Sequence, residues 1–234
     1  MKEAIVLVGG LGTRLRGIVN QLPKAMAPVN GRPFLEYQLG YLESKGITRV
    51  IMAVGYMKEA IMENFGSSYR SLALDYAVEE EPLGTGGAIM NAVSHLRGEQ
   101  FYILNGDTIF DIPLQKLQEI RNTKKADLVV ALRKVKDTSR YGGVTVDDEG
   151  RINGFVEKGS ASGEGWINGG IYLCSKEFLK NFNFNPKFSF EKEILEKEYS
   201  RRAIYGAGFI NYFLDIGIPK DYKRAQHEFR ELGY

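Results

Sequence analysis

The sequence predicts an α/β fold of the Rossmann-like type, with a doubly wound and mostly parallel sheet. Short apolar runs rich in Val, Ile and Leu recur through the first half of the chain, without the polar alternation of a half-exposed strand. Segments of helical length separate these runs. Glycine-containing turns follow several of them, at the ends where an open parallel sheet collects its ligands. Repeated β-α units of this kind form one sheet with helices on both faces.

The first part of the chain alternates strands and helices in order. We expect strands at 5–8, 49–54, 74–78, 101–104 and 128–132, and helices at 34–45, 57–65, 86–96 and 113–123. Pro33 suits the first turn of a helix, where its missing N–H costs nothing, and Gly46 suits a helix end. This part therefore predicts the parallel core of the sheet.

After about residue 133 the expected strands become shorter and closer together. They fall at 144–146, 152–157, 170–173, 203–207 and 209–214, with helices at 188–199 and 219–232. Asp148-Glu149-Gly150 is typical of a hairpin turn, and Pro219 suits a helix start. No repeat, low-complexity linker or charge block separates the two parts. We therefore expect a single domain, 1–234, in which residues 134–234 form a small antiparallel elaboration of the sheet.

The bulk properties favour a soluble globular protein with neither nucleic acid nor membrane as a partner. Of 234 residues, 44% are hydrophobic and 26% charged, and the formal charge of +2 is too small to favour nucleic acid. Cys174 is the single cysteine, which excludes an internal disulfide and fits a reducing compartment. No apolar run approaches the roughly 20 residues of a membrane helix, and the first strand begins too early to leave room for a signal peptide. We expect a cytoplasmic protein, and the sequence leaves the oligomeric state open, a homo-oligomer included.

The segment 4–35 has the composition of a polyphosphate-binding site. It contains a glycine turn and no Asp or Glu, and it carries the cations Arg14, Arg16, Lys24 and Arg32. Backbone made bare by glycine lets N–H groups approach phosphate oxygens, and the cations neutralise the charge. The P-loop pattern does not occur. The dinucleotide pattern fails at Leu15 and lacks its ribose-binding acid, so the segment predicts a nucleoside triphosphate site of another kind.

Seven motifs occur in order along nearly the whole chain. They are Gly9-Gly10-Leu11-Gly12-Thr13-Arg14-Leu15 followed by Leu22-Pro23-Lys24, then Glu81-Pro82-Leu83-Gly84-Thr85-Gly86-Gly87, Asn105-Gly106-Asp107, Tyr141-Gly142-Gly143-Val144, Phe155-Val156-Glu157-Lys158, Ile167-Asn168-Gly169-Gly170 and Leu214-Asp215-Ile216-Gly217. This pattern resembles the sugar-1-phosphate nucleotidyltransferases, whose fold is of the nucleotide-diphospho-sugar transferase type. Within that family the length and overall sequence are most similar to the D-glycero-D-manno-heptose 1-phosphate guanylyltransferases, followed by the mannose-1-phosphate guanylyltransferases.

The resemblance implies one in-line displacement, in which an oxygen of the sugar 1-phosphate attacks the α-phosphorus of GTP and pyrophosphate leaves. Such a step needs positioning and charge neutralisation more than covalent help. Arg14, Lys24 and Asp107 would be the catalytic residues, with Arg14 on the β- and γ-phosphates and Lys24 beside the α-phosphate. Solvated surface cations are the alternative for Arg14 and Lys24. The GDP-sugar formed would serve surface-polysaccharide synthesis.

The resemblance divides the binding residues between the two parts of the chain. Residues 1–133 would bind the nucleotide, through Leu7, Gly9, Gly10, Gly12, Thr13, Glu79, Glu80 and Gly84. Residues 134–234 would bind the sugar phosphate, through Gly142, Gly143, Glu157, Lys158, Asn168 and Gly169. Glu157 and Asn168 can hydrogen-bond sugar hydroxyls, and Lys158 can hold a phosphate. Surface positions on β-hairpins are the alternative for the second set.

Glu79, Glu80 and Glu81 make guanine the expected base. A carboxylate can accept hydrogen bonds from both of its adjacent donors, N1–H and N2–H₂. Uracil and thymine have one such donor. An exposed acidic run is the alternative explanation of these residues.

Asp107 and Asp215 are the candidate ligands of a metal cofactor, Mg²⁺. Each follows an apolar run, and the carboxyl ends of parallel strands lie at one edge of a sheet. Two carboxylates at that edge suit one Mg²⁺, with phosphate oxygens and water completing its shell. The alternative is that Asp107 is a turn residue and Asp215 a helix cap.

Departures from the family pattern keep other functions open. Ala25 and Gly159 stand where Pro follows each lysine in most members, which changes loop stiffness because Pro fixes φ and Gly frees it. The alternatives are mannose 1-phosphate as acceptor, uridylyl or thymidylyl transfer to a hexose 1-phosphate, and a catalytically silent nucleotide-sensing subunit. A nucleotide-sugar glycosyltransferase would need an Asp-x-Asp motif, which Asp107-Thr108-Ile109 interrupts.

Overall fold

The computed structural model describes residues 2–10, 22–160, 162–183 and 185–234. Its strands are β1 (Glu3–Leu7), β2 (Pro28–Val29), β3 (Arg32–Pro33), β4 (Arg49–Val54), β5 (Ser68–Tyr69), β6 (Leu72–Val78), β7 (Gln100–Asn105), β8 (Thr108–Phe110), β9 (Leu128–Val135), β10 (Gly143–Val146), β11 (Ile152–Val156), β12 (Gly165–Ser175), β13 (Ile204–Phe209) and β14 (Phe213–Asp215). Its α-helices are α1 (Phe34–Ser44), α2 (Lys58–Phe65), α3 (Gly84–Val93), α4 (Gln115–Lys124), α5 (Lys176–Lys180), α6 (Glu196–Glu198) and α7 (Pro219–Glu228). A 3-10 turn (Lys24–Met26) and a π-helical segment (Glu191–Leu195) complete the described elements.

The centre of the main sheet is parallel and has the strand order β6-β4-β1-β7. From β1 the chain adds β4 and β6 on one side, and it then crosses back through α3 to add β7 on the other side. This reversal places a topological switch point between β1 and β7, where open α/β sheets bind their ligands. Leu7 is in register with Asn105, so the segments that follow the two strands leave the sheet at the same level.

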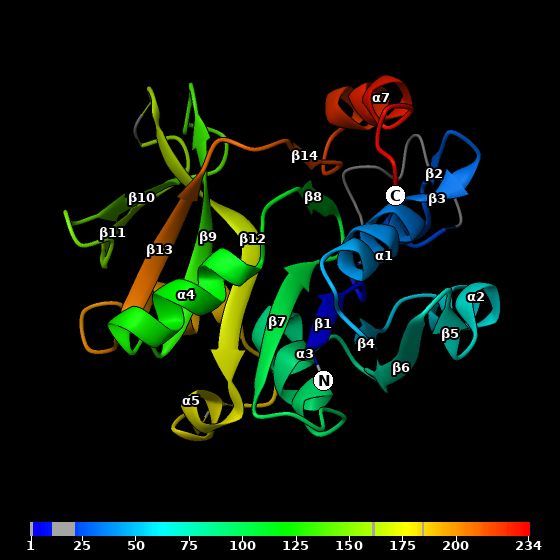
Figure 1. Ribbon diagram of the computed structural model, residues 1–234, viewed down its shortest axis with the longest axis horizontal. Coiled ribbons are helices and arrows are strands. Elements are labelled where there is room, and N and C mark those ends of the chain that lie inside the picture. The colour runs from blue at the N-terminus through cyan, green and yellow to red at the C-terminus, as the bar shows by residue number, and fades with distance from the viewer. Residues whose placement is uncertain (1, 11–21, 161, 184) are drawn as a thin grey trace.

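The rest of the sheet is mostly antiparallel. The long strand β12 runs antiparallel to β7 and to β9, and β10 and β11 form a hairpin beside it (Figure 1). β13 returns parallel to β9. The fold class expected from the sequence, a doubly wound mostly parallel sheet with a small antiparallel elaboration, is therefore confirmed.

Apolar clusters cover both faces of the sheet. One face is covered by α1, α2 and α4, through side chains such as Leu39, Ile61 and Leu117. The other is covered by α3, α5 and the π-helical segment, through side chains such as Ile89 and Leu179. A third cluster packs α7 against α1 and the small β8–β14 sheet, above the carboxyl edge of the main sheet (Figure 1). This last cluster anchors the β8–β14 sheet to α1 and α7.

Several expected elements need correction. The helix expected at 188–199 is broken into the π-helical segment and the single turn of α6, and the strand expected at 209–214 ends at Phe209 and resumes as β14. The short elements α5, β2, β3, β5 and β8 were not expected. Strands of two or three residues are too short to show a periodicity, and they form only where a distant segment supplies their partner. Within the described part of the chain, none of the helices combines the length and apolarity that a membrane crossing requires.

Candidate active site

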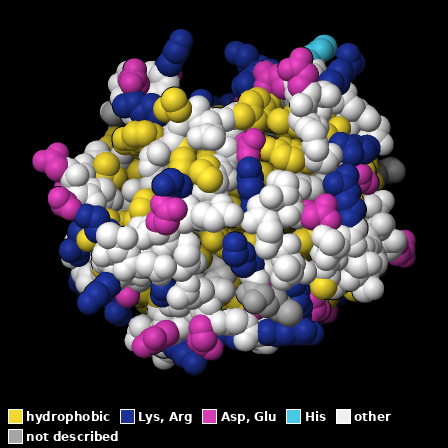
Figure 2. Space-filling view, viewed as in Figure 1, with side chains coloured by type: hydrophobic (Ala, Val, Ile, Leu, Met, Phe, Trp, Pro, Cys, Tyr) yellow, Lys and Arg dark blue, Asp and Glu magenta, His cyan; other side chains and the backbone are white. Residues whose placement is uncertain are grey.

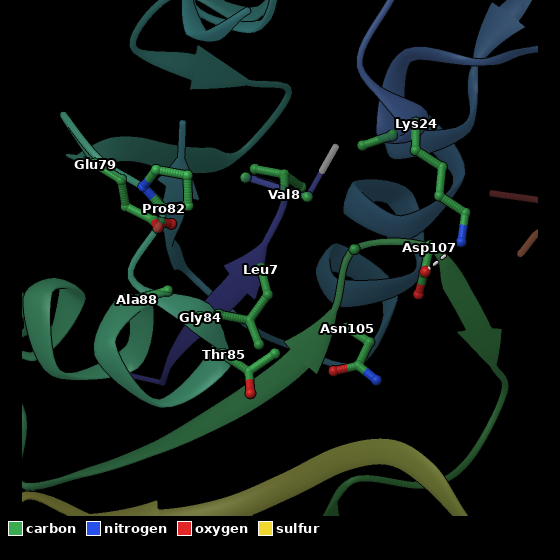
Figure 3. A pocket seen from close by; sticks show the side chains of 14 residues that line it. Leu7, Val8, Lys24, Glu79, Pro82, Gly84, Thr85, Ala88, Asn105 and Asp107 are labelled. Carbon is green, nitrogen blue, oxygen red and sulfur yellow. Dashed lines mark hydrogen bonds and ion pairs between the residues drawn. The ribbon is translucent and has the colours of Figure 1, made fainter. Parts of the chain in front are cut away.

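A cavity of about 320 Å³ opens at the switch point, at the carboxyl ends of β1, β6 and β7. Its volume is within the usual range for small-ligand sites. The lining comes from three segments after these strands and from the start of α3, and it comprises Leu7, Val8, Gly9, Gly10, Lys24, Ala25, Glu79, Pro82, Gly84, Thr85, Ala88, Asn105, Gly106 and Asp107. Figure 3 shows that Glu79 and Pro82 lie at one end of it, and Lys24 and Asp107 at the other. The cavity is therefore elongated between a carboxylate end and an end with mixed charge.

Glu79 forms the first end of the cavity together with Gly9. Its carboxylate accepts a hydrogen bond from the N–H of Leu83 at 3.0 Å, which fixes the side chain over the turn. A Cβ on Gly9 would lie 2.7 Å from Glu79 Oε1, so this glycine leaves the carboxylate its place. Burial raises the pKa of Glu79, against the lowering effect of the Leu83 hydrogen bond. A Cβ on Gly10 would meet none of the residues that the structure describes within 4 Å, and Gly10 itself lines the cavity.

Glu80 has a different environment from its neighbour. Its carboxylate is 83% exposed and pairs with Lys58 at 3.1 Å, and it does not line the cavity. Successive residues after β6 point in different directions, so only one member of the acidic run reaches the site. Glu81 is also exposed.

The start of α3 is positioned by the segment before the π-helical turn. The Thr85 hydroxyl donates to Glu191 at 2.6 Å and accepts from the N–H of Phe190 at 2.9 Å. The Gly86 N–H donates to the carbonyl of Phe188 at 3.0 Å, and a Cβ on Gly84 would lie 2.6 Å from that same oxygen. The glycines of this motif therefore permit a close backbone approach that orients the helix N-terminus at the cavity.

Lys24, Asp107 and Asp215 meet at the opposite end. The Lys24 ammonium forms an ion pair with Asp107 and lies 3.8 Å from Asp215 Oδ1. The side chains are 13%, 34% and 20% exposed, respectively. The structure therefore brings these three side chains together.

Backbone contacts hold the two carboxylates near each other. Gln38 donates to the carbonyls of Asn105 and Thr108, at 2.7 and 3.0 Å, and thereby fixes the turn that carries Asp107. β8 and β14 pair antiparallel with Asp215 opposite Thr108, and the N–H of Ile216 donates to the carbonyl of Asp107 at 3.0 Å. The β8–β14 sheet therefore holds Asp215 next to Asp107.

The carboxylates at this end repel each other and already face two cationic side chains, Lys24 and Arg140. Burial and the charge of Asp107 raise the pKa of Asp215, while Lys24, the N–H of Gly217 and Arg140 act in the opposite direction. Two neighbouring carboxylates offer the hard oxygen ligands that a divalent ion such as Mg²⁺ prefers. In the described residues no group of three or more His, Cys, Asp or Glu side chains could hold a metal. The donor set therefore fits an ion that takes two protein carboxylates and completes its shell from a phosphorylated substrate.

The expected acceptor residues lie beyond β7, on the neighbouring strands, and none of them lines the cavity. Gly142 has φ +83°, and a Cβ there would lie 2.8 Å from the carbonyl oxygen of Val156. Gly143 pairs with Val156 in the β10–β11 hairpin. Glu157 and Lys158 follow β11 and are exposed.

Asn168 and Gly169 have structural partners. The Asn168 amide donates to the Tyr172 hydroxyl at 2.8 Å and accepts from the N–H of Gly170 at 3.0 Å. A Cβ on Gly169 would lie 2.4 Å from the Phe110 ring, so packing explains this glycine. Both residues stabilise the irregularity in β12 where its register with β9 shifts.

Gly12, Thr13 and Arg14 lie outside the described residues. The structure instead adds residues that sequence reasoning did not select. Asn105 and Thr85 line the cavity and belong to motifs already recognised, so a closer reading of those motifs could have found them.

The chain has full-length similarity to known proteins. The model of the family described as nucleotidyl transferase matches residues 3–231. D-glycero-alpha-D-manno-heptose 1-phosphate guanylyltransferase of Aneurinibacillus thermoaerophilus is 47% identical over 97% of both chains, and the protein of the same name from Campylobacter jejuni is 44% identical over 94% of this chain and 96% of its own. The crystal structure of HddC from Yersinia pseudotuberculosis complexed with GMP-PN has a TM-score of 0.86 and 36% identity, covering 98% of this chain and 100% of that one.

Proposed function

The chain belongs to the nucleotidyl transferase family, and on this premise we propose that it transfers GMP from GTP to D-glycero-α-D-manno-heptose 1-phosphate, releasing pyrophosphate. The observation that carries the proposal is the near-full-length identity to two enzymes named for this reaction. The product would be a GDP-heptose for surface-polysaccharide synthesis. The cavity at the switch point supports the assignment, because its two ends differ in chemistry as the two ends of a nucleotide do.

GTP would lie along the cavity with its base at the Glu79 end. The Glu79 carboxylate can accept hydrogen bonds from guanine N1–H and N2–H₂, and Pro82 supplies an apolar surface beside it. The open backbone at Gly10 and the first turn of α3 direct N–H groups toward the phosphates. Specificity for guanine would thus rest mainly on one carboxylate.

The triphosphate would reach Lys24 at the other end. Asp107 and Asp215 would hold Mg²⁺, which when bound neutralises charge on the phosphate oxygens. Lys24 already lies between the two carboxylates, so its ammonium group is within reach of a phosphate bound to the same ion. Its task is to stabilise the charge that develops at the α-phosphorus as the acceptor oxygen attacks.

The acceptor would approach from the side of β10, β11 and β12. The exposed Lys158 can bind its phosphate, and the exposed Glu157 can accept hydrogen bonds from its hydroxyls. Gly142 and Gly143 present bare backbone near the same strands. Arg14 is proposed to bind the leaving pyrophosphate.

A substrate grid tests the proposal. The enzyme is incubated with Mg²⁺ and each of ATP, CTP, GTP, UTP and dTTP, in combination with heptose, mannose or glucose 1-phosphate, and pyrophosphate release is measured. We expect the highest kcat/KM for GTP with D-glycero-α-D-manno-heptose 1-phosphate. A preference for UTP or dTTP would overturn the guanine assignment, and a preference for mannose 1-phosphate would overturn the heptose assignment. No release in any combination would indicate a nucleotide-sensing protein.

A further inference from the structure

Arg140 lies between two carboxylates that belong to different parts of the fold. It is in the loop from β9 to β10, directly before Tyr141, Gly142 and Gly143. One terminal nitrogen forms an ion pair with Asp221 in the first turn of α7. The other, Nη2, lies 3.6 Å from Oδ2 of Asp215. The guanidinium therefore connects three parts of the fold: the loop before Gly142, the Asp215 carboxylate and α7.

The position of Nη2 suggests a function beyond a surface ion pair. Nη2 is buried and has no hydrogen-bond partner among the residues that the structure describes. A buried donor without a partner is costly, so an unmade bond of this kind calls for an explanation. The nearest carboxylate oxygen recorded for it, on Asp215, is just beyond hydrogen-bond distance. A small movement of either side chain would complete a contact with Asp215.

Asp221 provides the anchor on the other side. Its side chain is 7% exposed, and it also accepts a hydrogen bond from Arg224 at 3.2 Å. A carboxylate in the first turn of a helix is favourably placed with respect to the helix dipole. A series of alternating charges thus runs from Lys24 through Asp215, Arg140 and Asp221 to Arg224.

The surface of the molecule lies close to this series. Asp215, Asp221 and Tyr141 line a second cavity of about 500 Å³. Figure 2 shows a hollow between α7 and the end of β9, with Lys and Arg side chains on both sides of it. The loop from β9 to β10, which contains Arg140 and leads to Gly142 and Gly143, therefore faces α7 across this hollow; we call it the acceptor loop. The ion pair between Arg140 and Asp221 connects the loop to α7 and restricts their relative movement.

We propose that Arg140 is a positioning residue, which orients Asp215 for metal binding and couples it to the acceptor loop at Gly142 and Gly143. This inference rests on the proposed function. A planar guanidinium can contact two carboxylates at once through different edges, whereas an ammonium group is a point charge and cannot span them in the same geometry. Arg140 acts through Asp215 and through the loop backbone, and it does not need to touch a substrate.

The test compares Arg140→Met, Arg140→Lys and Asp221→Asn with the wild type. Mn²⁺ binding without substrates is measured by electron paramagnetic resonance, KM is measured for each substrate, and thermal unfolding is recorded. We expect both Arg140 variants to bind Mn²⁺ about tenfold more weakly, as is usual when a residue orienting a metal ligand is lost. With Mg²⁺ kept saturating for every variant, the KM for the sugar phosphate should rise by a similar factor, and the KM for GTP should change less than about twofold, because the Glu79 end is untouched.

The control is Arg224→Met, which removes the other partner of Asp221 and leaves Arg140 in place. It should leave Mn²⁺ binding and both KM values unchanged. Asp221→Asn should have a smaller effect than Arg140→Met, and the double variant should lose no more than Arg140→Met alone, because both changes act on one contact. Asp221→Asn also keeps the proposal testable if Arg140→Met does not fold.

Three results would overturn the proposal. Full recovery in Arg140→Lys would mean that charge alone matters. Tighter Mn²⁺ binding in either Arg140 variant would mean that Arg140 only competes with the metal. Normal Mn²⁺ binding and KM values in a folded Arg140→Met protein would leave a purely structural ion pair. A wild-type protein without pyrophosphate release would contradict the proposed function instead, and Mn²⁺ binding would still report on Arg140 and Asp215.

Discussion

Asp107→Asn separates the chemical role of this carboxylate from its structural one. The amide oxygen can still accept hydrogen bonds from Lys24 and from Thr108, which lies 3.2 Å away in the aspartate form. The Asp107 side chain is 34% exposed, and ion pairs of that exposure contribute little, so we expect the free energy of unfolding to change by less than about 1 kcal/mol. Loss of its charge also removes a repulsion on Asp215.

The effect of Asp107→Asn on turnover should be much larger. Loss of one of two candidate metal carboxylates removes transition-state stabilisation, and we expect kcat to fall by about a thousandfold or more, which corresponds to about 4 kcal/mol. The assay is pyrophosphate release at saturating GTP, sugar phosphate and Mg²⁺, with chemical denaturation in parallel.

Asp111→Asn is the matched control for this variant. Asp111 lies four residues further along the chain, is 35% exposed and pairs with Lys45 at 2.8 Å, but it does not line the cavity. It should retain the wild-type kcat. The reasoning would be refuted if Asp107→Asn kept more than a tenth of the wild-type kcat, or if Asp111→Asn lost as much as Asp107→Asn.

Three further predictions concern other parts of the molecule. Glu79→Gln should raise the KM for GTP by about tenfold, or about 1.4 kcal/mol, and narrow the preference for GTP over ATP, measured by initial rates; an unchanged preference would move the guanine site elsewhere. Glu3→Gln should destabilise the protein by about 3 kcal/mol in urea, because the fully buried carboxylate pairs with Arg49 at 2.7 Å, while kcat stays unchanged. Burial alone would raise the pKa of Glu3, but its hydrogen bonds outweigh burial and lower the pKa. The contribution of Glu3 to the free energy of unfolding is therefore complete above the ordinary glutamate pKa of about 4.3 and is lost as the pH falls below that value. In Glu3→Gln the loss of stability over this pH range should be smaller. Gly87→Ala would place a Cβ 2.1 Å from a backbone oxygen of the facing loop and should cost about 1–3 kcal/mol. By contrast, a Cβ at Gly10 meets no described residue within 4 Å, so Gly10→Ala should weaken GTP binding without lowering the melting temperature.

The strands of the parallel core could be located from the sequence because their signal is local. β4 has the bounds that its apolar run predicts, and β1 and β7 differ from the expected strands by one or two residues at an end. The position of Asp107 after β7 followed from the same signal, since a carboxylate after a buried strand must lie at the carboxyl edge of the sheet. Glu79 and Glu80 show the limit, because adjacent acidic residues have no pattern that tells which one turns inward.

Sequence alone therefore determined the α/β fold, the edge of the sheet that binds ligands and the family motifs that lie along it. Only the tertiary structure decided how the charges are paired: that Lys24 lies between Asp107 and Asp215, and that Arg140 connects Asp215 to α7. The physical reason is the range of the interactions. Apolar periodicity acts between neighbours in the chain, whereas these pairs depend on β8 and β14, strands of three residues each whose register exists only after distant segments have met.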